Sequence, residues 1–263
     1  ALAGLGQLGS VEAEGALKQA RSALPENTQT EYFEALLACA DSFRQAGNVI
    51  DASRLFQELL GQGPPEFVRL AAALLPELPT TTQLAVIDAL ADRGDPAALE
   101  ALFTLSSLPD DALRHAVASA LGALGNETHV ALLLDLLAGE DVELAKRARQ
   151  SLLQLADVGV NGALRQELAA SDPEFQPPIM ELLSERRVTL AVPALLVHAL
   201  HGEEAVQQAA FSALGTLVSG GEVVQLYGAY QETQDEKTRT VAGEALLTAF
   251  RRIPADENRT SLL

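Results

Sequence analysis

Residues 109–125 read PDDALRHAVASALGALG and contain an amphipathic helix with its own start and stop signals. Apolar residues stand four and one positions before Leu121 and three positions after it, a spacing that traces one face of an α-helix. Two aspartates precede the apolar run, where carboxylates favour the free N–H groups of a helix start. Gly125 follows it, and glycine is a common helix stop. The stretch therefore predicts one short helix with a buried face.

The central leucine of this helix returns at an almost constant interval. Successive gaps are 31, 31, 31, 31 and 32 residues, in the series Leu90, Leu121, Leu152, Leu183, Leu214 and Leu246. Twelve residues after each of the first five stands a second leucine, in the series Leu102, Leu133, Leu164, Leu195 and Leu226. Turn residues lie between the two series, so each period predicts two antiparallel helices. Because neither helix can bury its apolar face alone, the period is typical of stacked repeats.

These periods predict an all-α fold, an α-solenoid in which stacked helix pairs form a right-handed superhelix. We expect a regular array over residues 80–252, made of five helix pairs and a terminal helix. A polar tail follows at 253–263. The whole chain is expected to form one continuous solenoid.

The N-terminal part of the chain, residues 1–79, has a less regular pattern. Residues 1–24 fit a truncated repeat, and further helices are expected at 28–46, 49–61 and 65–77. The last of these has no assigned partner. Because the chain opens inside a repeat motif, we expect it to be a segment of a larger protein.

Several residues of the repeats match a known pattern. They are the acidic turn at 109–111, an arginine seven residues before the periodic leucine (Arg114, Arg239), the ending ALGALG at 120–125, and VPALL at 192–196. Together they resemble the HEAT repeat, and more closely the bacterial HEAT-like repeats of the phycobilisome-lyase type. The resemblance implies the solenoid fold and, as in most members, a protein-binding scaffold. Some members attach bilin chromophores and some relatives bind damaged DNA, so the fold does not define the function.

The chain departs from this pattern at a few positions. Gln207 replaces the family arginine. Asn161 and Arg165 interrupt apolar columns of one second helix, which either loosens that layer or marks a polar contact. Three prolines within residues 173–178 are expected to kink or delay the start of one first helix.

The charge balance restricts the class of partner. The chain has 36 acidic and 18 basic residues, for a net charge of −18. This charge argues against nucleic acid and anionic membranes, which attract lysine and arginine. No apolar run of about 18 residues occurs, so we expect a soluble protein without membrane insertion. Cys39, the single cysteine, is expected to be buried, and the compartment is left open between cytoplasm and periplasm.

Two groups of residues resemble sites of chemistry but have simpler explanations. His198 and His201 have a spacing that can hold a transition metal. The simpler explanation is that His198 is half-buried and that His201 interacts favourably with the carbonyl groups at the helix end. Acidic pairs begin the first helices at Asp110–Asp111, Glu140–Asp141, Glu203–Glu204 and Asp235–Glu236, where a helix N-terminus favours negative charge. We therefore predict no metal site, no cofactor and no enzymatic activity.

The predicted binding surface is the exposed face of the second helices, which line the concave side in the family that the repeats resemble. Its candidate residues are His129, Gln166, Gln225, Tyr227, Gly228 and Tyr230. Tyrosine is enriched among residues that dominate binding energy. In the alternative interpretation Tyr227 belongs to the core, because it occupies the repeat position of Phe103.

These observations predict a non-catalytic scaffold for protein–protein interaction. Its partner is expected to be another protein, a basic one being compatible with the charge, or another domain of the same polypeptide. Two alternatives are left open. One is an accessory domain that packs against an enzyme or haem domain of the same chain, and the other is a chromophore lyase or chaperone.

Overall fold

The computed structural model describes residues 1–25, 28–62, 68–69, 71–72, 75–78, 80–106, 110–156 and 158–252. Within these ranges the regular structure is helical and no residue is in a strand. Contacts divide the chain into two compact units, each of them a stack of helices. The N-terminal unit comprises residues 1–125 and 139–155, and the C-terminal unit comprises 126–138 and 156–263. The boundary drawn from the sequence at residue 79 separates an irregular repeat pattern from a regular one, and it stays a prediction.

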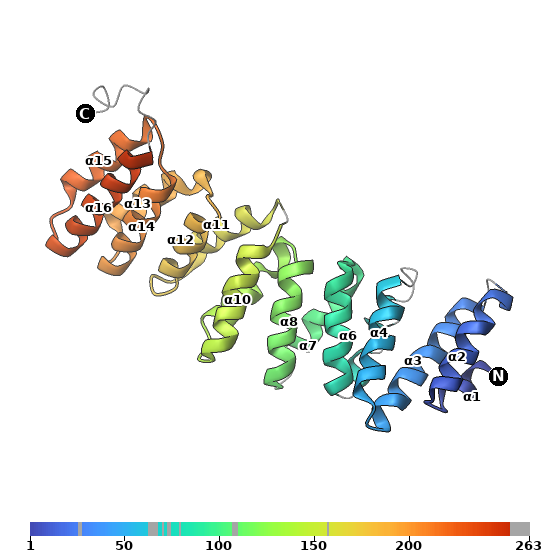
Figure 1. Ribbon diagram of the computed structural model, residues 1–263. Coiled ribbons are helices and arrows are strands. Elements are labelled where there is room, and N and C mark those ends of the chain that lie inside the picture. Colours follow the sequence, from blue (N-terminus) through green and yellow to red (C-terminus); the bar gives the residue numbers. More distant parts are fainter. Residues whose placement is uncertain are drawn as a thin grey trace. The chain divides into compact units, whose positions relative to one another are not determined.

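The N-terminal unit stacks its first helices side by side (Figure 1). Its helices are α1 (Leu2–Gly6), α2 (Val11–Ala20), α3 (Gln29–Gln45), α4 (Val49–Gln62), α6 (Thr80–Arg93), α7 (Leu99–Ser106), α8 (Asp111–Leu124) and α10 (Val142–Gln154), with the 3-10 turns η1 (Arg21–Ala23), η3 (Leu75–Glu77) and η4 (Pro96–Ala98). Helix α1 packs on α3, α3 on α4, α4 on α6, α6 on α8, and α8 on α10. Each helix thus contacts its neighbour in the stack, as a solenoid requires.

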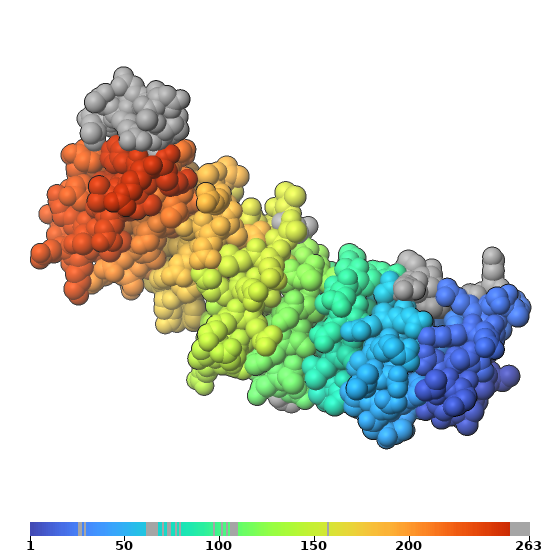
Figure 2. Space-filling model, viewed as in Figure 1, coloured from blue at the N-terminus to red at the C-terminus, as the bar shows by residue number. Residues whose placement is uncertain are grey.

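The C-terminal unit continues the same arrangement. Its elements are η5 (Glu127–His129), α9 (Val130–Leu137), α11 (Val160–Ala170), α12 (Gln176–Glu185), η6 (Thr189–Ala191), α13 (Val192–His201), α14 (Glu204–Leu217), α15 (Glu222–Glu232) and α16 (Glu236–Arg252). Helices α12, α14 and α16 pack in sequence, while α13 packs on both α14 and α15. In Figure 2 the sequence colours follow one another as bands within each unit. The expected α-solenoid fold is therefore confirmed.

Both leucine series form the core of their layers. The six periodic leucines are at most 7% exposed, and the five leucines of the second series are fully buried. Burial of a leucine side chain stabilises the fold by roughly 1.5–3 kcal/mol. Cys39 is also fully buried, and burial raises the pKa of its thiol. These positions confirm the repeat register read from the sequence.

Close approach between layers explains why glycine follows two of the six periodic leucines, Leu121 and Leu214. A Cβ atom at Gly215 would lie 2.8 Å from Cα of Ala245, and one at Gly122 would lie 2.9 Å from Cα of Ser151. Ala245 and Ser151 each stand one residue before the next periodic leucine. A side chain at either glycine would therefore push neighbouring helix backbones apart.

The acidic pairs at the helix starts are capping residues in three of the four cases. Side chains accept backbone N–H groups at Asp110 (Leu113, 3.1 Å), Asp141 (Glu143 and Leu144, 3.0 Å) and Asp235 (Thr238, 2.7 Å). Glu203 precedes α14 without such a bond. The three aspartates satisfy N–H groups that a helix leaves free at its start.

In four of the six repeats, the side chain seven residues before the periodic leucine contacts the segment that precedes its helix. It donates a hydrogen bond to a backbone carbonyl of the preceding segment in four repeats: Gln83 to Leu75, Gln176 to Ser171, Gln207 to Leu200, and Arg239 to Thr233. Three of these carbonyls, those of Ser171, Leu200 and Thr233, lie at the ends of α11, α13 and α15, where a helix leaves its last carbonyl groups without helical partners. Gln207 therefore makes the type of contact that Arg239 makes, and the departure from the family pattern conserves the link.

Two other sequence features can be located in the structure. Helix α12 begins seven residues before its leucine, at Gln176, with Pro177 in its first turn, so the expected delayed start is confirmed. Of the helix expected at 65–77, residues 68–69 and 71–72 are helical and 75–77 form η3, while 65–67, 70, 73 and 74 lie outside the described residues. No helix within the described ranges is long and apolar enough to cross a membrane.

Candidate functional site

The candidate binding residues all lie in the C-terminal unit, but on different elements. Gln225, Tyr227 and Tyr230 share α15, Gln166 lies on α11, and His129 ends η5. Gln166 and Gln225 are exposed, and the two tyrosines are half-buried. Gly228 also lies on α15, so the structure brings four of the six candidate residues together on one helix.

The tyrosine pair has a defined geometry at the end of α15. The rings of Tyr227 and Tyr230 are stacked, with centroids 6.3 Å apart and an interplanar angle of 23°. The Cζ atom of Arg239, on α16, lies 4.7 Å from the centroid of the Tyr230 ring. Arg239 is itself held by its hydrogen bond to the Thr233 carbonyl, at 3.1 Å. Aromatic and cation–π contacts of this kind hold the rings in place before any partner binds.

The alternative interpretation, in which Tyr227 is a core residue, is wrong. It assumed that the Phe103 position is buried, but Phe103 is 51% exposed and Arg165, at the same position of another repeat, is also exposed. This position lies thirteen residues after the periodic leucine, at the edge of the buried face. Side chains there are half-buried or exposed, so Tyr227 has a surface that a partner can contact.

His129 is not part of an exposed face, which corrects the sequence-based expectation. It is only 6% exposed, and burial lowers the pKa of its imidazole. The Asn126 N–H donates to Nδ1 of His129 at 3.4 Å, while the Asn126 side chain accepts the Thr128 N–H at 3.0 Å. The two side chains form a capping box at the start of the second helix. The sequence signal that could have revealed this role is the asparagine three residues before the histidine.

The exposed side chains of α15 and of the neighbouring helix α13 are mainly uncharged. On α15 they include Val224, which is 50% exposed, and Gln225; on α13 they include Ala194 and Val197, which is 58% exposed. Helix α13 contains no Asp, Glu, Lys or Arg, although such residues make up 21% of the chain. Depletion of charge together with enrichment of tyrosine is typical of the centre of a protein–protein interface.

We call this surface the α13–α15 face, defined by Ala194, Val197, Val224, Gln225 and Tyr227. Helices α13 and α15 are in contact within the C-terminal unit. The face offers apolar area, one amide and one aromatic ring with a phenolic hydroxyl, which suit binding to a protein surface.

The two histidines of α13 lie in its last turn. His198 is half-buried, and burial lowers the pKa of its imidazole, while His201 is exposed. In the described part of the chain, no group of three or more His, Cys, Asp or Glu side chains is arranged to hold a metal ion.

The comparisons with known proteins concern the fold. Residues 70–153 match the family model of HEAT repeats, so this part of the chain carries HEAT repeats. No curated protein matches the chain in sequence.

Three solved structures are similar over most of the chain. Human deoxyhypusine hydroxylase in complex with glycerol is 18% identical, with 95% of this chain and 96% of that chain covered and a TM-score of 0.38. An engineered protein is 21% identical, with 76% of this chain and 96% of that chain covered and a TM-score of 0.36. The E. coli protein YibA is 15% identical, with 90% of this chain and 97% of that chain covered and a TM-score of 0.35. At these TM-scores the similarities carry no argument about function.

Proposed function

We propose that the chain is a non-catalytic scaffold for protein–protein interaction and that the α13–α15 face is its binding surface. The observation that supports this proposal is the stacked Tyr227–Tyr230 pair, fixed by Arg239 beside uncharged exposed side chains. HEAT repeats are helical repeat scaffolds, and residues 70–153 carry them. The partner is another protein or another domain of the same polypeptide.

The chemistry of the face specifies what its partner presents. Val197 and Val224 favour an apolar patch, and the Tyr227 hydroxyl favours a hydrogen-bond acceptor or donor at its edge. Glu222 and Glu232 stand at the two ends of α15, so basic residues around that patch complement the surface. This arrangement places an acidic residue at each end of a mainly uncharged helix surface.

We also propose that the repeats are of the bacterial phycobilisome-lyase type. The support is Arg239, which stands at the arginine position of that pattern and contacts the end of the preceding helix. This assignment does not by itself imply a chromophore.

Affinity capture from a lysate of the source organism tests the proposed function. The bait is the native chain, and the test variant is Tyr227→Ala, because truncation of Tyr230 would also remove the contact to Arg239. Phe175→Ala is the matched control, an exposed aromatic residue outside α13 and α15. Circular dichroism melts establish that each variant is folded.

The expected result is a partner that the native chain and the Phe175→Ala variant retain and the Tyr227→Ala variant loses. Restored binding by Tyr227→Phe would assign the effect to the ring rather than the hydroxyl. A partner bound equally by Tyr227→Ala would rule out the α13–α15 face. Absorbance of a co-purified chromophore would instead favour the lyase or chaperone alternative.

A further inference from the structure

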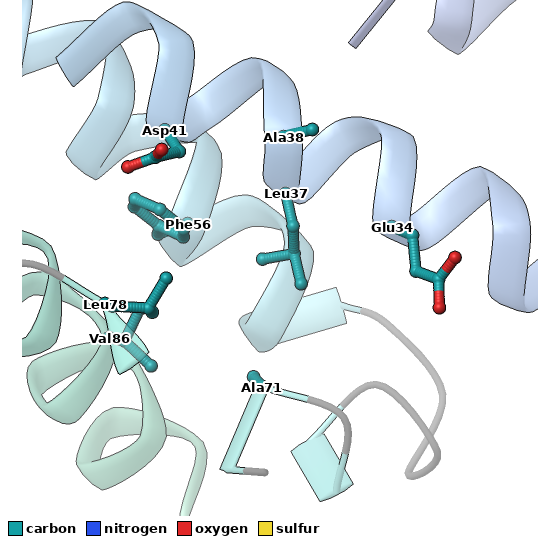
Figure 3. A pocket seen from close by; sticks show the side chains of 8 residues that line it. All are labelled: Glu34, Leu37, Ala38, Asp41, Phe56, Ala71, Leu78 and Val86. Atoms are coloured by element: carbon teal, nitrogen blue, oxygen red, sulfur yellow. The ribbon is translucent and has the colours of Figure 1, made fainter. Parts of the chain in front are cut away.

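A separate apolar pocket lies in the N-terminal unit (Figure 3). Its volume is about 230 Å³, and its lining residues are Glu34, Leu37, Ala38, Asp41, Phe56, Ala71, Leu78 and Val86. Four of them come from α3, one from α4 and one from α6. Figure 3 shows Leu37 and Phe56 facing the space between these elements, with the carboxylates of Glu34 and Asp41 at its two sides.

The floor of the pocket is built from core residues. Phe56, Ala71 and Val86 are at most 1% exposed, and Leu37 is 9% exposed. Their remaining surfaces pack inside the unit, so the pocket is a shallow opening in a rigid core. Ala38 and Leu78 are half-buried and form part of the rim. The base of the opening is therefore apolar and buried, and its exposed surface comes mainly from Ala38, Leu78, Glu34 and Asp41.

The size of the pocket restricts its occupant. A cavity of about 150 Å³ holds a benzene-sized group, and pockets for whole drug-sized ligands start near 300 Å³. A volume of about 230 Å³ lies between these limits. It suits a single large apolar side chain, such as leucine, methionine or phenylalanine.

The rim of the pocket carries negative charge on one helix. Glu34 and Asp41 are seven residues apart on α3, which corresponds to about 10 Å along the axis. Asp41 accepts hydrogen bonds from Arg44 at 3.0 Å and Gln45 at 2.7 Å. Among the described residues, the exposed carboxylate of Glu34 forms no hydrogen bond or ion pair. It is therefore available to a cation on the occupant.

We infer that this pocket binds one large apolar side chain of a basic amphipathic helix from a partner protein. A lysine or arginine one turn from that side chain pairs with Glu34, in the way that helix-in-groove recognition combines an apolar anchor with flanking charges. The net charge of −18 steers such a segment toward the chain. This site is independent of the α13–α15 face, and either can fail without the other.

A model peptide tests the inference on the full chain. The probe is a fluorescein-labelled helical peptide of lysine and alanine with one central phenylalanine, titrated by fluorescence anisotropy. The matched peptide has alanine in place of phenylalanine. We expect the phenylalanine peptide to bind at least about tenfold more tightly.

Two variants separate the apolar anchor from the charge. Ala38→Phe fills the pocket and is expected to abolish the difference in affinity between the two peptides. Its control is Ala123→Phe, on the exposed face of α8. Glu34→Gln is expected to weaken the binding of both peptides several-fold and to reduce the salt dependence of that binding. Its control is Glu244→Gln, on α16. Because Glu34 is exposed, this variant remains informative if Ala38→Phe fails to fold.

Three results would overturn the inference. They are equal binding of the two peptides by the native chain, an unchanged preference in folded Ala38→Phe, and no binding of the phenylalanine peptide up to about 1 mM. Equal binding would show attraction by charge alone.

Discussion

Arg186 donates a hydrogen bond from its Nε atom to the Oδ1 atom of Asn161 at 2.8 Å. Both residues stand in columns that are mainly apolar in the other repeats, Asn161 in a second helix and Arg186 after a first helix. Both are half-buried, and burial lowers the pKa of Arg186. Of the two explanations for the interrupted column, the polar contact is the correct one for Asn161. Arg165, by contrast, is exposed.

This pair predicts an asymmetric response to substitution. Asn161→Ala removes the acceptor of a charged donor and should lower the free energy of unfolding by about 1–3 kcal/mol. The double substitution Asn161→Val with Arg186→Leu restores apolar side chains at both positions. It should lower the free energy of unfolding by less than Asn161→Ala does. Urea denaturation of both variants measures the difference. A double variant less stable than Asn161→Ala would contradict this account.

The contact between Gln207 and the Leu200 carbonyl predicts that either glutamine or arginine can serve at this position, whereas alanine cannot. Gln207→Ala should lower the free energy of unfolding by about 0.5–1.5 kcal/mol, because a carbonyl at the end of α13 loses its donor. Gln207→Arg should retain the native stability, since Arg239 makes the corresponding contact. Gln231→Ala is the control, an exposed helical glutamine. Equal thermal melts for Gln207→Ala and Gln231→Ala would argue against the contact.

The buried carboxylate of Glu14 predicts a pH-dependent contribution to stability. Arg54 donates to its two oxygens at 3.0 and 2.7 Å, and Lys18 lies 2.7 Å away. Hydrogen bonding by Arg54 lowers the pKa of Glu14 below its ordinary value of 4.5. The stabilisation is therefore fully present above pH 4.5 and is lost as the pH falls through the lower, folded-state pKa.

Glu14→Gln tests this dependence. Near pH 7 it should lower the free energy of unfolding by about 1–3 kcal/mol, less than a fully buried pair would, because Arg54 is 45% exposed to screening solvent. The difference from the native chain should shrink as the pH falls below 4.5. Glu174→Gln, at an exposed turn, should show no such trend in urea midpoints. A difference that is constant from pH 7 to 3 would exclude the mechanism.

The sequence predicts those features that are periodic or local. Leu133 and Leu164 could be assigned to the core because a fixed period repeats the same environment. Asp141 could be assigned to a helix start because a cap depends on neighbours two and three residues away. Such assignments need no knowledge of how distant segments meet.

Other features depend on contacts that a single sequence does not display. Glu14 and Arg54 are 40 residues apart, and no period connects them. His129 was expected on an exposed face, because its repeat position alone does not reveal that its ring turns back toward Asn126. The pocket beside α3 requires side chains from three helices to leave a space, which only packing decides.

Helices α14 and α16 approach each other closely at Gly215. Alanine is favoured over glycine inside a helix by about 1 kcal/mol when there is room for its methyl group. At Gly215 there is no room, since the added Cβ would lie 2.8 Å from Cα and 2.9 Å from the carbonyl oxygen of Ala245. Gly215→Ala should therefore lower the free energy of unfolding by about 1–3 kcal/mol. Gly162→Ala on α11, where no atom lies within 4 Å, should instead raise it by about 0.5–1 kcal/mol. Opposite shifts in the urea midpoint are expected, and shifts of the same sign would mean that the two helices do not approach as closely as described.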